Sequence, residues 1–554
     1  MATDSQQTPA GLPAALAAWR ALLGGQRVLN DAATLELYAR STSSFSTVPA
    51  AVLRPHSTDE VAAVVRIAAR HRVALYPIST GRNWGYGDAC AAGDGQVIVD
   101  LGGMNRIVEV STTLAYVVIE PGVTQQQLSR YLIEHRIPLW MDCTGAGPDT
   151  SLTGNILERG FGHSPYGNRF QNVAGMQIVL ADGAVLDTGF GHFPNAQATH
   201  VFPYGLGPYL DGLFTQSNLG IVTRLGLWLM PQTACINHFL CKVERHEQIA
   251  TVVDALRPLR LDGTLRSILH IGNDLRVISG GTVYPRERAG GQLPLPDALR
   301  RAMREQAGVG AWTVSGALYG SAAQVALARR ALRRALKPTG ARAQFLDERK
   351  LALAALAARL LARWPLGRRL GAKVALGRSL FEMNRGIPNG RFLAGAYWRR
   401  RTGLPADFPE HANPARDNCG MLWVSPIAPM RGELVLRLHA LAEPIFQEHG
   451  FDLFVTFSMI NDRALGGVIT VAYDKDDARE VERAQACYRR LFEVLMVAGY
   501  LPYRVGLQSM AALDDGNDVY WRTVKQIKDA LDPGRILAPG RYEGRRTDGA
   551  APGA

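Results

Sequence analysis

Residues 77–87 of this chain read PISTGRNWGYG, a glycine-rich loop that follows a short apolar strand predicted over residues 73–79. Glycines uncover main-chain N–H groups, and consecutive N–H groups in such turns bind phosphate oxygens. The glycines of this loop are Gly81, Gly85 and Gly87. One cation and two hydroxyl groups that can add contacts to an anion come from Arg82, Ser79 and Thr80. No helix is predicted directly after the loop, so it matches neither a P-loop nor the G-x-G-x-x-G dinucleotide fingerprint. A structural turn is the competing interpretation of this loop taken alone.

The segments around the loop alternate between short apolar strands and amphipathic helices. A helix is predicted over residues 57–72, with Ser57 as its N-cap and Glu60 three residues later. A hairpin with an Ala-Asp-Gly turn is predicted over residues 176–189. Further strands are predicted at residues 50–55, 96–101, 107–110, 115–122 and 220–231, and a further helix at 123–136. This order of elements is typical of an α/β domain.

Two other stretches expose backbone donors in the same way. Residues 150–155, TSLTGN, combine small hydroxyl residues with a glycine, and Asn155 and Arg159 are candidate partners for a pyrophosphate or a polar ring edge. Residues 218–223, NLGIVT, run past Gly220 into a strand and can pair edgewise with a flat heterocycle. Each stretch taken alone is a weak signal.

The composition limits the class of protein. The 554 residues are enough for two or three domains, and 47% hydrophobic with 20% charged residues is typical of globular chains. The six cysteines show no C-x-x-C spacing, so neither a metal site nor a disulfide framework is predicted. The net charge of +12 favours anionic partners, but no nucleic-acid-binding motif accompanies it. The sequence has no signal peptide and no apolar run of 18 residues, so we expect a soluble, cytoplasmic protein without membrane or nucleic-acid partners.

Changes in composition and in the predicted elements along the chain indicate the domain organisation. We expect a first domain over residues 1–231, with its core at about 46–231, and a second α/β or α+β domain over residues 232–500. Residues 501–546 are expected to return to the first domain, and residues 547–554 to form a disordered tail.

Two segments of the second domain have clear patterns. Residues 468–473, VITVAY, predict a buried strand. Residues 321–363 are rich in Ala, Leu and Arg, and we expect them to be helical. An exposed amphipathic helix with a solvated arginine face is favoured over a helix that lies on a membrane or a partner. No role is predicted for the arginine-rich region 321–378 as a whole.

The three glycine-containing stretches, in this order and spacing, resemble the FAD domain of the vanillyl-alcohol oxidase and p-cresol methylhydroxylase family. The resemblance covers roughly residues 50–543 and is specific as a combination. It implies a two-domain α+β fold, with a FAD domain built from N- and C-terminal segments and an α+β substrate domain. Further matching segments are residues 201–223 (VFPYGLGPYLDGLFTQSNLGIVT), 385–390 (RGIPNG), 422–429 (LWVSPIAP), 501–506 (LPYRVG) and 530–541 (ALDPGRILAPGR).

The resemblance implies FAD as the cofactor and assigns the residues that hold it. Residues 79–87 match the pyrophosphate loop of the family, and residues 150–160 match a second FAD strip. Ile221 matches a residue beside the adenine half, and Arg541 matches a segment at the flavin ring, where a positive charge stabilises the reduced flavin anion. The implied cofactor residues are Ser79, Thr80, Gly81, Arg82, Asn83, Gly85, Thr150, Ser151, Gly154, Asn155, Gly160, Gly220, Ile221 and Arg541.

The resemblance also implies a para-substituted phenol as substrate. Members of the family bind the phenolate oxygen with two tyrosines and an arginine, and the matching positions here are Tyr86, Tyr503 and Arg504. A phenol with a pKa of about 10 is almost wholly neutral at pH 7, and these donors favour its anion. The phenolate then pushes electron density toward the para carbon. A hydride leaves the benzylic carbon for flavin N5, and the resulting quinone methide gives an alcohol, aldehyde or vinyl product.

The sequence departs from the family pattern at the point of flavin attachment. Met421 stands where the histidine-linked oxidases have the linking histidine, and a thioether cannot replace imidazole in that linkage. We therefore expect non-covalent FAD, with Tyr397 and His411 as the alternative attachment sites.

Other departures concern the substrate pocket. His163 replaces a tyrosine common beside the flavin, and it is either a proton acceptor or a buried histidine bonded to backbone. Asp149 is the nearest match to the family's acidic residue near N5. Gly466 and Gly467 replace a histidine pair, which predicts a substrate bulkier than vanillyl alcohol or p-cresol.

Two alternatives of other kinds remain. An enzyme of the same fold that acts on a hydroxy acid or a sugar lactone would give Tyr86, Tyr503 and Arg504 no role. A redox-silent homologue would serve as a binding or partner subunit without a flavin spectrum. For the phenol enzyme, the residues leave open whether oxygen or a redox protein such as a cytochrome accepts the electrons, and analogy with the family predicts a homodimer.

Overall fold

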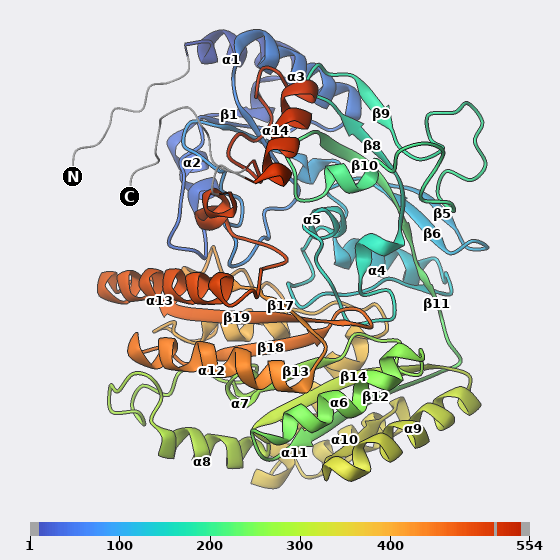
Figure 1. Ribbon diagram of the computed structural model, residues 1–554, viewed down its shortest axis with the longest axis vertical. Helices are drawn as coiled ribbons and strands as arrows, with labels where there is room; N and C mark the ends of the chain where they lie inside the picture. The colour runs from blue at the N-terminus through green and yellow to red at the C-terminus, as the bar shows by residue number, and fades with distance from the viewer. Residues whose placement is uncertain (1–9, 515–517, 544–554) are drawn as a thin grey trace.

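The computed structural model describes residues 10–514 and 518–543. A four-stranded and a five-stranded sheet built from the first 231 residues lie at one end of the molecule, and one large sheet built from residues 235–474 lies at the other (Figure 1). A separate two-stranded sheet pairs residues 139–140 with residues 230–231. The predicted disordered tail at residues 547–554 lies outside the described residues.

The first small sheet has the strand order β1-β2-β4-β3, in which β2, β4 and β3 run parallel. Helix α3 connects β2 to β3, and its predicted N-cap is confirmed, since the Ser57 hydroxyl accepts the Glu60 N–H at 3.2 Å. Helix α1 packs on α3. The elements are α1 (Leu12–Leu23), β1 (Val28–Leu29), α2 (Ala32–Ala39), β2 (Ala51–Leu53), α3 (Thr58–His71), β3 (Leu75–Ile78) and β4 (Val97–Asp100).

The second small sheet is antiparallel, with the strand order β5-β6-β10-β8-β9. The predicted hairpin over residues 176–189 is confirmed as the β8–β9 pair. The elements are β5 (Ile107–Ser111), β6 (Tyr116–Ile119), α4 (Gln125–Glu134), β7 (Leu139–Trp140), α5 (Leu152–Leu157), β8 (Val173–Val179), β9 (Val185–Asp187), β10 (Ile221–Trp228) and β11 (Met230–Pro231).

The large sheet has eight antiparallel strands in the order β15-β12-β14-β13-β18-β19-β16, with β17 paired to β19. Its strands are β12 (Cys235–Val243), β13 (His270–Asn273), β14 (Trp312–Gly320), β15 (Arg342–Leu346), β16 (Cys419–Val424), β17 (Ile427–Pro429), β18 (Phe454–Met459) and β19 (Ala464–Asp474). The strand predicted at residues 468–473 is confirmed as part of β19.

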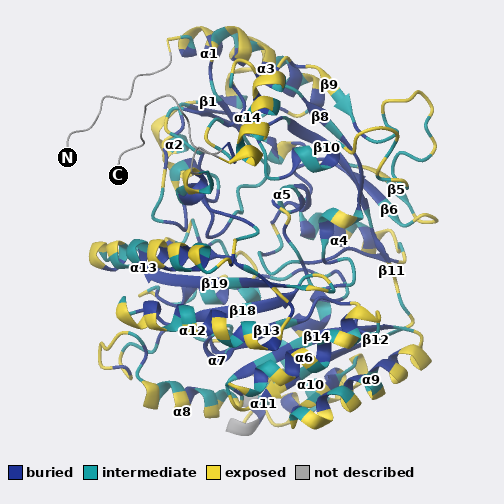
Figure 2. Cartoon of the chain, in the orientation of Figure 1, coloured by how far each residue is buried: buried dark blue, intermediate teal, exposed yellow. Residues whose placement is uncertain are grey.

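Helices α6, α9, α12 and α13 pack together along one face of this sheet (Figures 1 and 2). The helices of this part of the chain are α6 (Gln248–Leu261), α7 (Asp274–Ile278), α8 (Asp297–Ala307), α9 (Ala322–Leu336), α10 (Glu348–Leu360), α11 (Pro365–Met383), α12 (Gly432–Glu448) and α13 (Ala478–Val497).

Side chains on the large sheet alternate between two environments. On β18, Val455 and Phe457 join the core beneath the helices, whereas Thr456 and Ser458 line a cavity on the other face. Because successive side chains of a strand point to opposite faces, this alternation makes the sheet the floor of the cavity. The same alternation on the neighbouring strands turns these residues to the cavity: Leu240, Lys242, Thr313, Ser315, Met421, Trp423, Val468 and Thr470.

The expectation of a helix throughout residues 321–363 is wrong. Helix α9 ends at Leu336, strand β15 follows at Arg342–Leu346 and pairs with β12, and helix α10 begins at Glu348. Gly340, with φ of +74°, reverses the chain between the helix and the strand. In the described part of the chain, no helix is long and apolar enough to span a membrane.

The C-terminal segment returns to the first small sheet. The Leu75 N–H donates to the Ile536 carbonyl at 2.7 Å, and the Ala538 N–H donates to the Leu75 carbonyl at 2.7 Å. Helix α14 (Val519–Leu531) precedes this contact and buries Lys528, whose ammonium group donates to Asp532 at 2.7 Å. With the change of sheets after Pro231, these contacts support our proposed domain division at residues 231 and 500.

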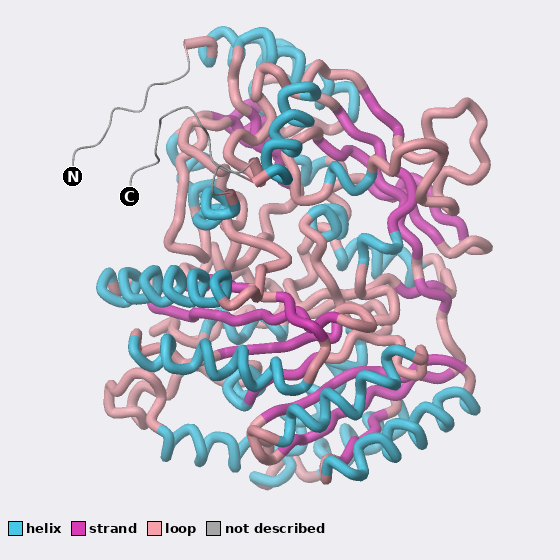
Figure 3. The backbone as a smooth tube through the Cα atoms, in the orientation of Figure 1, coloured by secondary structure: helices cyan, strands magenta, loops and turns pink. Residues whose placement is uncertain are grey.

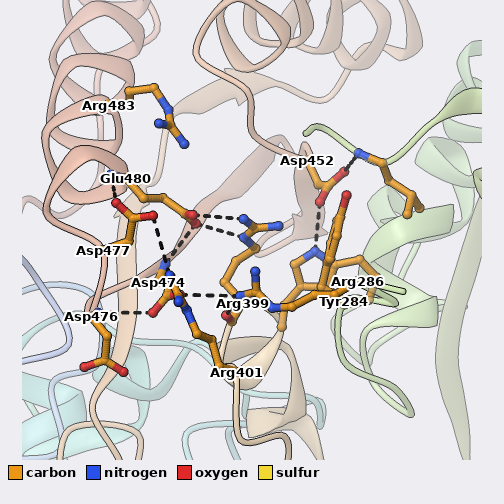
Figure 4. A network of polar contacts seen from close by, with 12 residues as sticks. Tyr284, Arg286, Arg399, Arg401, Asp452, Asp474, Asp476, Asp477, Glu480 and Arg483 are labelled. Carbon is orange, nitrogen blue, oxygen red and sulfur yellow. Dashed lines mark hydrogen bonds and ion pairs between the residues drawn. The ribbon is translucent and has the colours of Figure 1, made fainter. Parts of the chain in front are cut away.

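A buried charge network ties the segment that follows α11 to helix α13 and to the end of β19 (Figure 4). The Arg399 guanidinium makes two hydrogen bonds of 2.9 Å to the Glu480 carboxylate, and each side chain is only 3% exposed. Glu480 also accepts the backbone N–H of Asp474 at the end of β19. Arg399 lies two residues after the 3-10 helix η6 (Arg391–Tyr397), so the pair fixes a segment that walls the cavity.

Replacing Glu480 with Gln should destabilise the protein by about 3–5 kcal/mol, because it leaves the Arg399 charge buried without a counter-ion. Chemical denaturation checks this. Glu36→Gln, which breaks the exposed pair with Arg40, is the control and should leave the midpoint nearly unchanged. Equal midpoints for the two variants would contradict the structural role of the network.

Candidate active site

A cavity of about 790 Å³ lies between the small sheets and the large sheet. Much of its wall is made by the long loops that occupy this region in Figure 3. The size is in the range of pockets that hold small molecules and cofactors. Two of the glycine-rich stretches, around residues 79–83 and 150–155, meet at one end of it.

The two stretches are in direct contact. The Ser151 N–H donates to the Thr80 hydroxyl at 3.1 Å, and the Ser151 hydroxyl caps α5 by accepting the Gly154 N–H at 2.9 Å. A Cβ on Gly154 would lie 2.3 Å from the Ser79 hydroxyl oxygen, so any other residue there would displace that hydroxyl. Gly81 has a φ of +64°, a conformation that other residues rarely adopt. The result is a cradle of uncovered N–H groups and hydroxyls that fits a pyrophosphate.

Thirteen of the fourteen predicted cofactor residues line the cavity. The exception is Gly85, where a Cβ would lie 2.9 Å from the Trp423 ring and whose carbonyl accepts the Trp423 N–H. Gly85 therefore serves the packing of the loop against β16. The thirteen lining residues are Ser79, Thr80, Gly81, Arg82, Asn83, Thr150, Ser151, Gly154, Asn155, Gly160, Gly220, Ile221 and Arg541.

A buried ion pair that the sequence did not reveal supports this wall. The Arg169 guanidinium donates to Asp142 at 2.8 Å and to the Asn155 side chain at 3.0 Å. Asp142 also accepts the backbone N–H of His163 at 3.0 Å. Arg159, a candidate anion ligand from the sequence, instead donates to the Thr215 hydroxyl and does not line the cavity.

The three predicted phenolate-binding residues lie together. The Arg504 guanidinium carbon is 4.3 Å from the centroid of the Tyr86 ring, and Tyr503 shares a hydrogen bond with Tyr86. Tyr503 and Arg504 line the cavity, whereas Tyr86 is 1% exposed and its hydroxyl lies 2.5 Å from the Ser425 hydroxyl. Tyr86 thus sits behind Tyr503.

The surroundings shift the pKa of both phenols. Burial raises the pKa of Tyr86 and of Tyr503, and their shared hydrogen bond raises the pKa of Tyr86 further but lowers that of Tyr503. The Ser425 hydroxyl, 2.5 Å from that of Tyr86, lowers the pKa of Tyr86.

Glu158 lies between the two arginines of the site. Its carboxylate is 3.2 Å from Arg504 Nε, and its other oxygen pairs with the Arg541 guanidinium. Arg541 also donates to the Tyr76 hydroxyl at 2.7 Å, and Arg504 donates to the Asn83 side chain. Two cations and one carboxylate leave an excess of one positive charge beside the cavity.

Sequence reasoning missed Glu158. Glu158 directly precedes Arg159 in the stretch NILERG, and the sequence favoured Arg159 as the anion ligand because it is a cation beside a glycine. Glu158 is the C-cap of the six-residue helix α5, and from there it lines the cavity. A helix of six residues is too short to show a hydrophobic periodicity in the sequence.

Histidines cluster on the side of the cavity away from the cradle. The rings of His163 and His270 are 4.3 Å apart, and His270 Nδ1 lies 2.9 Å from the Ser458 hydroxyl. Burial lowers the pKa of His163 to about 3, that of His238 to about 4, and that of His270 well below its usual value. All three are therefore neutral at pH 7. Phe161 stacks between this cluster and Tyr503, with ring centroids at 6.4 Å from His270 and 5.7 Å from Tyr503.

Three other predicted positions have different surroundings. Asp149 is 62% exposed, lies 3.8 Å from Arg82 and is not part of the cavity wall. Met421 lines the cavity. Neither alternative attachment residue does: His411 is exposed, and the buried Tyr397 hydroxyl donates to Asp417 at 2.7 Å.

Comparison with known proteins identifies the fold and the cofactor. Residues 49–189 match the family model described as the FAD binding domain. The chain is 40% identical over 540 residues to the 1'-carboxy-chondrochloren decarboxylase of Chondromyces crocatus, covering 96% of this chain and 98% of that one. It is 30% identical over 527 residues to the 4-cresol dehydrogenase [hydroxylating] flavoprotein subunit of Pseudomonas putida, covering 94% of each chain.

The solved structures agree. The crystal structure of p-cresol methylhydroxylase with substrate bound superposes with a TM-score of 0.85 at 30% identity, over 96% of this chain and 97% of that one. The predicted two-domain α+β fold is thereby confirmed, and FAD is the cofactor. The cradle described above fits it, because its uncovered N–H groups and hydroxyls suit a pyrophosphate.

The buried histidines predict how stability depends on pH. Their folded-state pKa values lie below the unfolded value of about 6.5, so the unfolded chain binds more protons as the pH falls from about 6.5 to 4, and stability falls with it. His238→Gln should flatten this dependence, because it removes one of the groups with a lowered pKa. His238 is chosen because it does not line the cavity. Denaturation midpoints at saturating FAD across this range check it, with the exposed His192→Gln as control. Parallel curves for all three proteins would contradict the assignment.

Proposed function

Because the chain belongs to the vanillyl-alcohol oxidase and p-cresol methylhydroxylase family of FAD-dependent oxidoreductases, we propose that it removes a hydride from the benzylic carbon of a para-substituted phenol. The observation that carries this proposal is the cluster of Tyr503, Arg504 and Tyr86 at a cavity that adjoins the FAD cradle. A hydroxy-acid or lactone dehydrogenase has no need of such a cluster.

The cluster is suited to stabilise a phenolate. Tyr503 lines the cavity and donates its proton to the substrate oxygen, whereas Tyr86 lies behind it and bonds the Ser425 hydroxyl. Arg504 supplies the charge, held in place by Asn83 and Glu158. Tyr86 therefore acts through Tyr503, which refines the expectation that both phenols grip the substrate directly. Charge-assisted hydrogen bonds of this kind lower the pKa of a bound phenol.

The remaining residues orient the substrate and exclude water. Phe161 packs beside Tyr503, so a phenol held at Tyr503 extends past this ring toward the histidine cluster. His163 and His270 are neutral, and their lowered pKa values make them weak bases, so a hydrogen-bonding role in the pocket is favoured over the proton acceptor considered for His163. FAD, when bound, supplies the hydride acceptor. Glu158 offsets one of two positive charges, so one remains for the phenolate.

Replacing Tyr503 with Phe should lower kcat/KM for 4-ethylphenol by about 10- to 100-fold, the cost of an unmet hydrogen bond to a charged oxygen. Anaerobic flavin bleaching measures it. The control Tyr500→Phe removes a hydroxyl outside the cavity wall and should change nothing. Unchanged turnover in Tyr503→Phe would favour a hydroxy acid or lactone as substrate.

We propose that FAD is held without a covalent bond. Met421 lines the cavity at the attachment position, Tyr397 is engaged by Asp417, and His411 is exposed. Acid precipitation should therefore release the yellow flavin into the supernatant. Flavin that stays in the pellet would contradict the proposal, and loss of that retention in Tyr397→Phe would identify the linking residue.

A second candidate is oxidation coupled to decarboxylation, the activity in the name of the relative from Chondromyces crocatus. It is favoured by the charges on the cavity wall: the described lining residues from 235–474 include five basic side chains and no carboxylate. Hydride loss from a phenolate whose side chain bears a carboxylate would give a quinone methide. The electrons of the bond to the carboxyl carbon then form the vinyl double bond and restore the phenolate as CO2 leaves. One CO2 per reduced flavin would support this reaction, and none would exclude it.

The electron acceptor and the assembly are also proposals. Oxygen or a redox protein can reoxidise the flavin, and the net charge of +12 favours an acidic partner. We keep the homodimer as a prediction from the family.

A further inference from the structure

The cavity continues beyond the phenol end, across the open face of the large sheet. His270 lies on β13, beyond Phe161 as seen from Tyr503. Two residues further along β13 is Gly272, which also lines the cavity. Its register partners are Thr313 on β14 and Thr456 on β18. Directly paired residues point to the same face of a sheet, so the two threonines flank the open position that Gly272 leaves.

Arg276 lies over this position. It belongs to the short helix α7, which follows β13 directly, and a Cβ on Gly272 would lie 3.7 Å from its Cγ. Its guanidinium passes next to Gly395 of η6, where a Cβ would lie 2.8 Å from Nη1. Burial is the main cause that lowers the pKa of His270, and Arg276 lowers it slightly further. Arg276 is itself part of the cavity wall.

The Arg276 guanidinium has neither a hydrogen bond nor an ion pair among the described residues. Burial lowers its pKa, and no carboxylate opposes that effect. The fully buried arginines Arg169 and Arg399 are each paired with a carboxylate, Asp142 and Glu480. The hydroxyls of Thr313 and Thr456 likewise have no partner within the described chain. Arg276 is half-buried in the cavity wall, and a partly desolvated cation without a counter-ion is costly, so this arrangement indicates a site for an anion.

We propose that Arg276, with the hydroxyls of Thr313 and Thr456, binds a carboxylate carried by the para side chain of the phenolic substrate. The proposal deepens the proposed function and rests on it. A carboxylate suits the site because a guanidinium offers two parallel N–H donors and the threonines can serve the remaining lone pairs. The substrate is then anchored at both ends, by the phenol at Tyr503 and by the anion at Arg276, with the benzylic carbon between them.

Two ligands of the same shape test the proposal: 3-(4-hydroxyphenyl)propanoate and its neutral amide, titrated calorimetrically into the FAD-loaded enzyme. The carboxylate should bind about 10- to 100-fold more tightly than the amide, as expected for a charge-assisted pair. Arg276→Gln should abolish that ratio, whereas Lys242→Met, which removes an exposed cation elsewhere on the wall, should keep it. Gly395→Ala keeps the charge but displaces the guanidinium, and should reduce the ratio as well.

The outcomes separate the two proposals. Equal binding of carboxylate and amide by the unmodified enzyme, or an unchanged ratio in Arg276→Gln, overturns the anion site even if both compounds bleach the flavin. A ratio that depends on Arg276 supports the site even if neither compound bleaches the flavin, a result that would instead count against the proposed hydride transfer. Propionate alone is the third arm: if it binds as tightly as the phenolic carboxylate, the site holds a free anion and the proposed substrate class is wrong.

Discussion

A strand has only two faces, and the arrangement of this protein follows from how the eight-stranded sheet uses them. One face packs against α6, α9, α12 and α13 through residues such as Phe457 and Val471. The other is left for a ligand, so it carries small hydroxyl side chains where a core would carry apolar ones, for example Thr456, Ser458 and Thr470. Because the period along a strand is two, a register slip of one residue would bury the hydroxyls and turn Phe457 into the cavity. The hydrophobic layer on one side thereby fixes the geometry of the chemistry on the other.

The cavity wall is also organised by charge. On the FAD-domain side, Glu158 pairs with both Arg504 and Arg541, and Asp142 balances Arg169. On the large-sheet side the described wall carries basic side chains and no carboxylate, and Arg276 has no partner there. A phenolate at one end and an acidic side chain at the other would complete this balance. The difference between the two sides is the physical reason to treat the second domain as the source of substrate specificity.

Local signals made part of this structure predictable. The Ser57 cap, the hairpin at residues 176–189 and the strand at residues 468–473 are confirmed because short-range hydrogen bonds and apolar runs determine them. The failure at residues 321–363 has a local cause too: β15 is a five-residue strand rich in Arg, Ala and Gln, with little strand propensity of its own, and it forms through pairing with β12. At the site, motif resemblance brought Tyr86, Tyr503 and Arg504 together. Glu158, His270 and Arg276 carry no motif, and only the meeting of distant segments reveals them.

The return of the C-terminal segment has a consequence for biosynthesis. Strand β3 leads into the glycine-rich loop at residues 77–87, and its free edge is covered by Ile536–Ala538, more than 450 residues later in the chain. At ordinary translation speeds, the ribosome needs roughly tens of seconds to make the intervening chain. During that time β3 presents an uncovered strand edge, which is a known template for wrong pairing. Until residues 536–538 leave the ribosome, this edge of β3 has no partner strand, so the nascent FAD domain is incomplete for most of its synthesis.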